Sequence, residues 1–297
     1  MKKILSMVAV LAMVLGLTGC GNSNNNTDTT PKSVLEQIQE KGYITLATSP
    51  DFAPNEFYVL QDGQQTIVGT DIFLAQAVAE EIGVELKISA VEFNNVISEV
   101  QSGLADFGLS GFAWTETRAA TVEFSESYAQ TADDEWQGLM VRKEDASKYQ
   151  SLDDIKAANL TIGAQLGSIQ YEMASHLTDT SNIVSIGDNT ILALELATGG
   201  IDAYVITSTQ GAAAMNANDG IVLLPGDSFN LDPENKYDQM CAVFAKDADN
   251  ESLIEIVNKV ITEAKEVKED GRCQLDVWND EAEALLPFDL TAEIYGY

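Results

Sequence analysis

The chain has 297 residues, of which 47 are acidic and 16 are Lys or Arg, so its formal net charge is −31 at pH 7. A surface this acidic argues against nucleic acid or anionic lipid as a partner, because both carry the same sign of charge. The charge says little about a small ligand, since a carboxylate-binding pocket can lie inside an acidic shell. We interpret the acidic excess as mostly a solvated face.

The N-terminus has the pattern of an export signal. Lys2 and Lys3 precede an apolar run, Ile4 to Leu17, that is too short to cross a bilayer as a helix. The run ends Leu17-Thr18-Gly19-Cys20, which resembles the lipobox of bacterial lipoproteins. The alternative is a buried apolar helix, which the two lysines and this ending disfavour. We therefore predict that Cys20 is lipidated and begins the mature chain.

The residues that follow have nothing to bury. The stretch 21–30 consists mostly of Asn, Thr and Ser, a composition typical of a disordered linker. We therefore expect a signal peptide at 1–19 and a lipidated, flexible tether at 20–32. About 265 residues remain, enough for two lobes.

The first half alternates predicted helices and strands. In chain order we expect a helix opened by a capping box at Ser33 and closed by Gly42, a strand at 43–47, a loop at 49–54, a hairpin of 56–60 and 66–68, a helix from an N-cap at Asp71 to Ile82, a strand at 84–89, and a helix at 94–102. This order predicts a largely parallel sheet whose ligand crevice lies at the carboxyl ends of the strands.

The next stretch combines several anion-binding features. Asp106 opens a short buried strand, the small residues 110–113 form a loop, and Thr115 is a suitable helix N-cap with Arg118 in the first turn. Free N–H groups and an arginine fork at one point are suited to a carboxylate. The alternative is an ordinary strand–loop–helix with a solvated arginine.

The second half repeats the first. Val96-x3-Val100-x2-Gly103-x2-Asp106 parallels Leu192-x3-Leu196-x2-Gly199-x2-Asp202, in each case a helix, a glycine stop and a strand. We expect the further elements to be a helix capped by Ser151, a strand at 160–164, a helix from Gly167-Ser168, a strand at 183–186, helix 190–198, strand 203–206 and a helix from Ser208. Two similar α/β lobes are therefore predicted.

Four motifs carry a resemblance to a known family. They are Gly103-x2-Asp106, Ser110-Gly111, Thr115-x2-Arg118 and Phe124-Ser-Glu-Ser-Tyr128. Their sequence and order, from about Val34 onward, resemble the extracytoplasmic solute-binding proteins of amino-acid ABC importers.

The resemblance implies a two-lobed, type II periplasmic-binding-protein fold with two crossings between the lobes. Lobe one is then expected at 33–128 plus 231–297, lobe two at 137–222, and the crossings at 129–136 and 223–230. The strand at 239–245 and the helix at 251–270 would return to lobe one.

The resemblance also implies which residues bind the ligand. Phe52 matches the aromatic residue that stacks on the ligand, and Arg118 matches the arginine that pairs with its carboxylate. The remaining expected pocket residues are Ser110, Gly111, Ala113, Gln165, Gly167, Ser168, Ile169 and Thr207. Trp114 and Trp136 are candidates for the wall, although a tryptophan more often belongs to a core.

Two departures from the family pattern concern the ligand's amine. Thr207 stands where family members carry an acid for the ammonium, and Ser49 stands at the second acidic position, found in binders of cationic amino acids. Leaving an ammonium unpaired in the pocket would be costly. Either another acid substitutes, the candidates being Asp51, Glu116, Glu135 and Glu172, or the amine is absent or masked. A basic ligand side chain is not expected.

Two cysteines remain besides Cys20. Cys241 begins a strand and Cys273 follows a helix that runs back along it, so a disulfide can form in an exported protein. Two buried thiols are the alternative. A single His and the absence of a C-x-x-C motif argue against a zinc site.

The expected function is capture of an amino acid or similar small carboxylate and its delivery to an ABC permease and ATPase. We expect an exported monomer, anchored by lipid to the outer face of the cytoplasmic membrane, with no metal and no other cofactor. A ligand sensor with the same fold is one alternative. A cyclohexadienyl or arogenate dehydratase-like enzyme is another, but it would need a general acid or base in the cleft, and His176 is expected on a helix surface.

Overall fold

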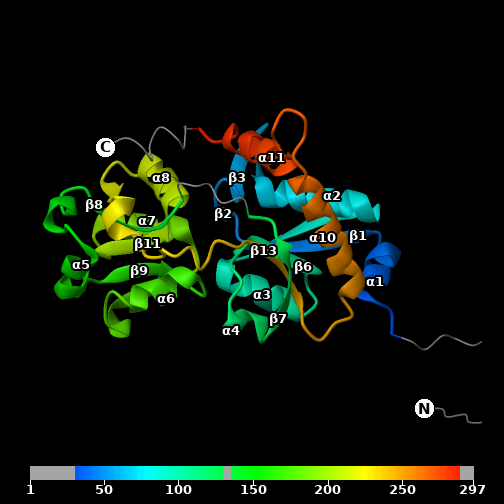
Figure 1. The fold of residues 1–297 in the computed structure, drawn as a ribbon, viewed down its shortest axis with the longest axis horizontal. Helices are drawn as coiled ribbons and strands as arrows, with labels where there is room; N and C mark the ends of the chain where they lie inside the picture. Colours follow the sequence, from blue (N-terminus) through cyan, green and yellow to red (C-terminus); the bar gives the residue numbers. More distant parts are fainter. Residues whose placement is uncertain (1–30, 130–134, 288–297) are drawn as a thin grey trace, which may run out of the picture. The chain divides into compact units, whose positions relative to one another are not determined.

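The structure, a computed structural model, describes residues 31–129 and 135–287. The predicted signal peptide, the lipidation site Cys20 and nearly all of the tether therefore lie outside the described residues. The described chain contains two five-stranded sheets, each flanked by helices, and one three-stranded sheet (Figure 1). No helix within these ranges is long and apolar enough to cross a membrane.

The first sheet has the order β5-β1-β6-β13-β7. Strand β1 pairs in parallel with β5 and β6, whereas β13 runs antiparallel to both β6 and β7. The strands are β1 Tyr43–Thr48, β5 Glu85–Ala90, β6 Phe107–Phe112, β7 Val122–Ser127 and β13 Cys241–Ala245. The helices are α1 Val34–Lys41, α2 Thr70–Ile82, α3 Phe93–Gln101, α4 Glu116–Ala119, α10 Glu251–Lys265 and α11 Gln274–Glu283. Helices α2 and α10 pack together over this sheet (Figure 1).

The second sheet has the order β10-β9-β11-β8-β12. Its strands are β8 Gln137–Arg142, β9 Ile162–Gln165, β10 Ile183–Ile186, β11 Ala203–Thr207 and β12 Ile221–Leu223. Its helices are α5 Leu152–Ala158, α6 Ile169–Ser175, α7 Asn189–Thr198, α8 Ser208–Ala217 and α9 Gly226–Phe229. Each sheet has its own buried apolar clusters, so the chain forms two lobes, as predicted.

The return to the first lobe comes later than predicted. The chain leaves the first sheet after β7 and enters the second at β8, consistent with the expected crossing at 129–136. After β12, however, Leu231 N–H donates to the Gln137 carbonyl at 2.8 Å, and Tyr237 still packs on the second lobe's core. Met240 packs on the first lobe's core, so the crossing lies between 237 and 240 and not at 223–230.

Most helix starts follow the local sequence signals. Ser33 and Glu36 form the predicted capping box, and Thr115, Ser151 and Ser168 each accept a backbone N–H as N-caps. Side-chain oxygens satisfy N–H groups that have no partner within the helix, and each such cap stabilises a helix by about 1 kcal/mol.

Asp71 is the exception. Helix α2 begins at Thr70, and its N-cap Gly69 has no side-chain oxygen to offer. Asp71 therefore lies inside the first turn, where its side chain is fully buried. The expected N-cap is wrong, because a contact with a distant loop and not a local cap fixes where α2 starts.

That contact is a close approach of two backbones. The Thr70 and Asp71 N–H groups donate to the Pro54 and Asn55 carbonyls at 3.1 and 2.9 Å. The loop containing Asn55 joins β2 (Asp51–Phe52) to β3 (Glu56–Gln61), which pairs with β4 (Gln64–Val68) as the predicted hairpin. Gly69 has φ +134°, and a Cβ there would lie 2.1 Å from the Asn55 carbonyl oxygen.

The disulfide expected between Cys241 and Cys273 is not formed in the structure. Cys241 is buried in the middle of the first sheet, opposite Phe112 and Ser127, where burial raises the pKa of its thiol to about 11. Cys273 packs in a separate small cluster with Ala264 and Leu275. The expectation was wrong because the two side chains enter different parts of the core.

We predict that Gly69→Ala lowers the free energy of unfolding by more than about 3 kcal/mol, because the methyl group would overlap the Asn55 carbonyl. Urea unfolding followed by circular dichroism measures the change. Gly83→Ala is the matched control: its φ is +81° but its surroundings are open, so only backbone strain of about 1–2 kcal/mol is expected. Equal losses in the two variants would contradict the packing argument.

Candidate functional site

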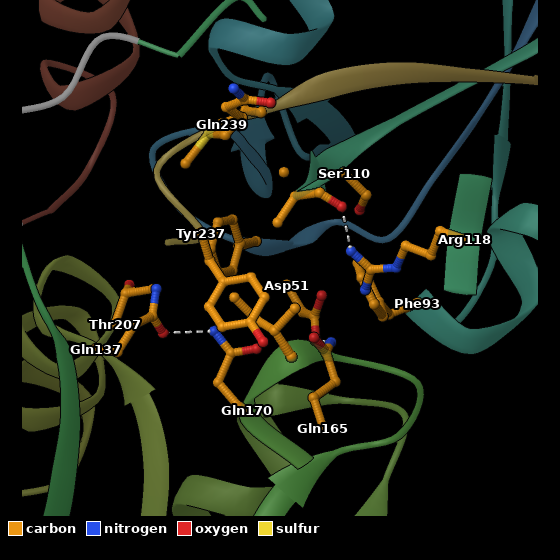
Figure 2. A pocket seen from close by; sticks show the side chains of 15 residues that line it. Asp51, Phe93, Ser110, Arg118, Gln137, Gln165, Gln170, Thr207, Tyr237 and Gln239 are labelled. Carbon is orange, nitrogen blue, oxygen red and sulfur yellow. Dashed lines mark hydrogen bonds between the residues drawn. The ribbon is translucent and has the colours of Figure 1, made fainter. Parts of the chain in front are cut away.

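A cavity lies where the two lobes meet, at the carboxyl ends of strands from both sheets (Figure 2). Residues at or just beyond the carboxyl ends of β1, β6, β9 and β11 reach it, as expected for an open α/β sheet. Its lining from the first lobe is Asp51, Phe52, Phe93, Ser110, Gly111, Ala113, Arg118, Gln239 and Met240. Its lining from the second lobe is Gln137, Gln165, Ile169, Gln170, Thr207 and Tyr237.

Eight of the ten residues expected in the pocket line this cavity; they are Phe52, Ser110, Gly111, Ala113, Arg118, Gln165, Ile169 and Thr207. Two are not part of the lining: Gly167, whose carbonyl accepts from Arg118 at 3.0 Å, and Ser168. The Ser168 hydroxyl donates to the Gln165 carbonyl at 2.7 Å and accepts the Tyr171 N–H at 3.3 Å, so this side chain caps α6.

Arg118 lines the cavity from the first turn of α4. Its two terminal nitrogens donate to the carbonyls of Ala113 in the first lobe, at 2.8 Å, and Gly167 in the second, at 3.0 Å. The guanidinium lies over the rings of Phe93 and Phe112, with its carbon 5.7 and 5.2 Å from their centroids. Burial lowers the pKa of Arg118 to about 10, so it remains charged at neutral pH.

No carboxylate in the described chain forms an ion pair with Arg118. A guanidinium presents five N–H donors, and two carbonyls cannot neutralise its charge. The arrangement therefore favours an anionic group in the cavity beside it.

Ser110 and Gly111 belong to β6, which extends to Phe112; the expected loop starts only at Ala113. The Ser110 hydroxyl donates to Glu56 Oε1 at 2.5 Å and accepts the Ser49 N–H at 3.1 Å. The Ser110 hydroxyl is thus engaged by the protein and holds the cavity floor in place. Gly111 has φ +58°, and a Cβ there would lie 3.1 Å from the Phe52 ring.

Two fully buried acids, Glu56 and Asp71, lie behind this floor. Asp71 Oδ2 accepts the Tyr128 hydroxyl at 2.9 Å and the Gly111 N–H at 3.4 Å. Burial raises the pKa of Asp71 to about 6 and that of Glu56 well above its usual range. Sequence reasoning missed this pair: Asp71 had the pattern of an N-cap, and no local signal marks Glu56.

Of the four acids considered as partners for a ligand amine, Asp51 is the one that lines the cavity. Glu135 contacts the hydroxyls of Thr207 and Thr209, and Glu172 accepts the Tyr237 hydroxyl at 3.1 Å. Glu116 is exposed in α4. Thr207 itself accepts the Gln210 N–H at 3.3 Å and caps α8.

The rest of the lining is neutral and includes four glutamine side chains: Gln137, Gln165, Gln170 and Gln239. The Gln170 amide donates to Gln137 Oε1 at 2.8 Å (Figure 2). Besides Phe93, sequence reasoning missed Gln137, Gln170, Tyr237, Gln239 and Met240; Asp51 was named only as one of four candidate acids. Several of the missed residues lie on or beside the crossings, where their position depends on how the lobes are joined.

Two other candidates do not line the cavity: Trp114 is 49% exposed, and Trp136 packs on the second lobe's core. His176 is exposed at the end of α6, as expected. Within residues 31–129 and 135–287, no cluster of three or more His, Cys, Asp or Glu side chains could hold a metal ion.

Comparison with known proteins identifies the family. A family model described as "Bacterial extracellular solute-binding proteins, family 3" matches residues 44–274. The arginine-binding extracellular protein ArtP of Bacillus subtilis (strain 168) is 30% identical over 276 residues, which cover 92% of this chain and 96% of ArtP.

Solved structures agree in fold. The amino acid ABC transporter substrate-binding protein AbpA from Streptococcus pneumoniae, bound to L-arginine, aligns with a TM-score of 0.72 and 35% identity over 87% of this chain and 99% of AbpA. The ancestral amino acid-binding protein AncCDT-1, a precursor of cyclohexadienyl dehydratase, aligns with a TM-score of 0.68 and 25% identity over 84% and 99%. The chain therefore belongs to family 3 of the bacterial extracellular solute-binding proteins.

Proposed function

We propose that this solute-binding protein captures an α-amino acid in the cavity between its lobes and delivers it to an ABC importer. The observation that carries the proposal is Arg118, a charged guanidinium that faces the cavity and has no carboxylate partner in the described chain. Its fork can form two parallel hydrogen bonds with the solute's carboxylate. Relatives that bind arginine support an amino acid as the solute and make L-arginine the first ligand to test.

Capture would work by closing the lobes on the solute. Four hydrogen bonds between the lobes frame the cavity: Arg118 to the Gly167 carbonyl, Gln165 and the Asn189 N–H to Asp51, and Gln210 to the Ala53 carbonyl. A ligand that contacts both lobes binds the closed arrangement more tightly and so shifts the equilibrium toward it. A closed, loaded protein then offers the permease a surface that differs from the unloaded one.

The cellular setting that we propose follows from the N-terminal sequence and the family. The protein would be exported, lipidated at Cys20 and held as a monomer at the outer face of the cytoplasmic membrane, where a permease and an ATPase complete the transporter. The lobe boundaries, with the return crossing at 237–240, and the residues that line the cavity are part of the same proposal.

We propose that the protein is not an enzyme. Among the described lining residues Asp51 is the only carboxylate, and it takes part in hydrogen bonds that join the two lobes. His176 lies outside the cavity, so the described lining offers no imidazole as a general base. The similarity to AncCDT-1, itself an amino acid-binding protein, fits a binding role.

We predict that Arg118→Ala weakens binding of the captured amino acid by roughly 100-fold to 3,000-fold, because removing one partner of a desolvated charge pair costs about 3–5 kcal/mol. Arg118→Lys should restore only part of the loss, since an ammonium cannot form the fork. A thermal-shift screen of the twenty standard L-amino acids first identifies the ligand, and titration calorimetry then gives its affinity. Arg272→Ala is the control, because Arg272 pairs with Asp280 and neither residue lines the cavity. Arg118→Ala with the affinity of wild type would rule out this anchor.

We predict that Cys20→Ala moves the protein from the membrane fraction to the medium or periplasm, because Cys20 would carry the lipid. Fractionation and immunoblotting measure the change, and Cys273→Ala is the control. Unchanged membrane retention of the Cys20 variant would contradict lipidation at this residue.

A further inference from the structure

Asp51 is a cavity-lining carboxylate whose hydrogen bonds join the two lobes. Its Oδ2 accepts the Asn189 N–H at 2.6 Å and Gln165 Nε2 at 3.1 Å, both from the second lobe. Its Oδ1 accepts the Ser49 hydroxyl at 2.8 Å. All of these donors are neutral, and no Lys or Arg in the described chain forms an ion pair with Asp51. The lobes thus meet around an ionisable group to which the protein supplies no counter-ion.

The groups around Asp51 do not neutralise it. Asp188 at the start of α7, Glu56 on β3 and Tyr204 on β11 all interact electrostatically with it, and each is an acid or a phenol. Arg118 and Tyr237 line the same cavity. Burial, reinforced by the Asp188 charge, raises the pKa of Asp51 to about 6. Asp51 is therefore still ionised at pH 7.5, where a cation beside it would be stabilised.

We infer that Asp51 binds a nitrogen cation of the captured solute, an ammonium or a guanidinium, and that this cation makes closure of the lobes favourable. The inference rests on the proposed function, in which the solute's carboxylate binds Arg118. Closing the lobes withdraws the Asp51 carboxylate from water, which costs free energy unless an opposite charge accompanies it. A solute with both charges compensates Arg118 and Asp51 together, whereas an acid without the cation leaves Asp51 uncompensated.

This assignment also accounts for Thr207. The second lobe lacks an acid at the position where the family places one for the ligand amine, and the Thr207 hydroxyl is engaged in capping α8. Asp51 supplies a negative charge to the same cavity from the first lobe. A basic solute is then compatible with the site, contrary to the expectation drawn from the sequence.

Asp51→Asn removes the negative charge of residue 51 while its hydrogen bonds can be kept. The asparagine oxygen can accept from Asn189 and Gln165, and its amide can donate to the Ser49 hydroxyl, so the contacts between the lobes are retained. Asp188→Asn is the matched control: it removes a neighbouring charge, asparagine is also an N-cap, and residue 188 does not line the cavity.

The test is titration calorimetry of the full-length protein at pH 7.5 with three ligands. L-Arginine carries both cations, L-citrulline lacks the guanidinium charge, and 5-guanidinopentanoate lacks the α-ammonium. We expect Asp51→Asn to weaken L-arginine binding by about 100-fold and Asp188→Asn by less than about threefold. Wild type should bind one of the two analogues about 100-fold more weakly than L-arginine, and Asp51→Asn should abolish that difference. The analogue that loses affinity tells which cation Asp51 binds.

Acidification provides an independent readout. A cation beside Asp51 lowers the pKa of this carboxyl in the complex, so affinity should be constant above about pH 6 and fall as the pH drops below it. Asp51→Asn should lose this dependence. If another amino acid emerges from the screen, the same comparison uses that amino acid and its deaminated analogue.

Two outcomes distinguish a failure of the proposed function from a failure of the role assigned to Asp51. Wild-type protein that binds none of the twenty amino acids contradicts the proposed function itself. Wild-type protein that binds an amino acid, with Asp51→Asn equal to wild type or to Asp188→Asn, overturns only the role assigned to Asp51.

Discussion

The site depends on two opposite charges, Arg118 and Asp51, that line one cavity without a counter-ion from the described chain. Each is held by neutral groups: Arg118 by two carbonyls and two aromatic rings, Asp51 by a hydroxyl, an amide and a backbone N–H. Neutral partners fix the position of a charge but compensate only part of its desolvation. A solute with complementary charges is therefore the natural partner of this cavity.

A set of buried contacts holds the cavity floor beside these two charges. Gly69 lets α2 start against the loop that follows Asp51 and Phe52. The same contact puts Asp71 beneath the cavity floor. Glu56 and Asp71 then hold Ser110 and Gly111 from behind. Because these buried acids engage the Ser110 hydroxyl and the Gly111 N–H, Arg118 is left as the main group facing an anion.

Sequence reasoning succeeded where the signal was local or repeated. Helix caps such as Ser33 and Thr115 can be recognised from the four residues that form them. The duplicated helix–glycine–strand pattern predicted two lobes. The motif from Asp106 to Arg118 placed the arginine correctly at the cavity. These features need no knowledge of the distant chain.

Sequence reasoning failed where contacts between distant parts of the chain decide where an element begins or which side chain faces the cavity. Asp71 has the sequence pattern of an N-cap, but the approach of Asn55 moves the helix start and buries the carboxylate. Tyr237 reaches the cavity because the return crossing comes later than the position expected from the family resemblance. Asp51 could be named only as one of four candidate acids, since which of them faces the cavity depends on how β2 packs between the lobes.

The most direct test of this account is a crystal structure of the protein with its amino acid bound, beginning with L-arginine. The account predicts that the solute's carboxylate forks onto Arg118 and that a solute nitrogen lies within hydrogen-bond distance of Asp51. A complex in which the carboxylate binds elsewhere, with Arg118 bonded only to the Ala113 and Gly167 carbonyls, would contradict it.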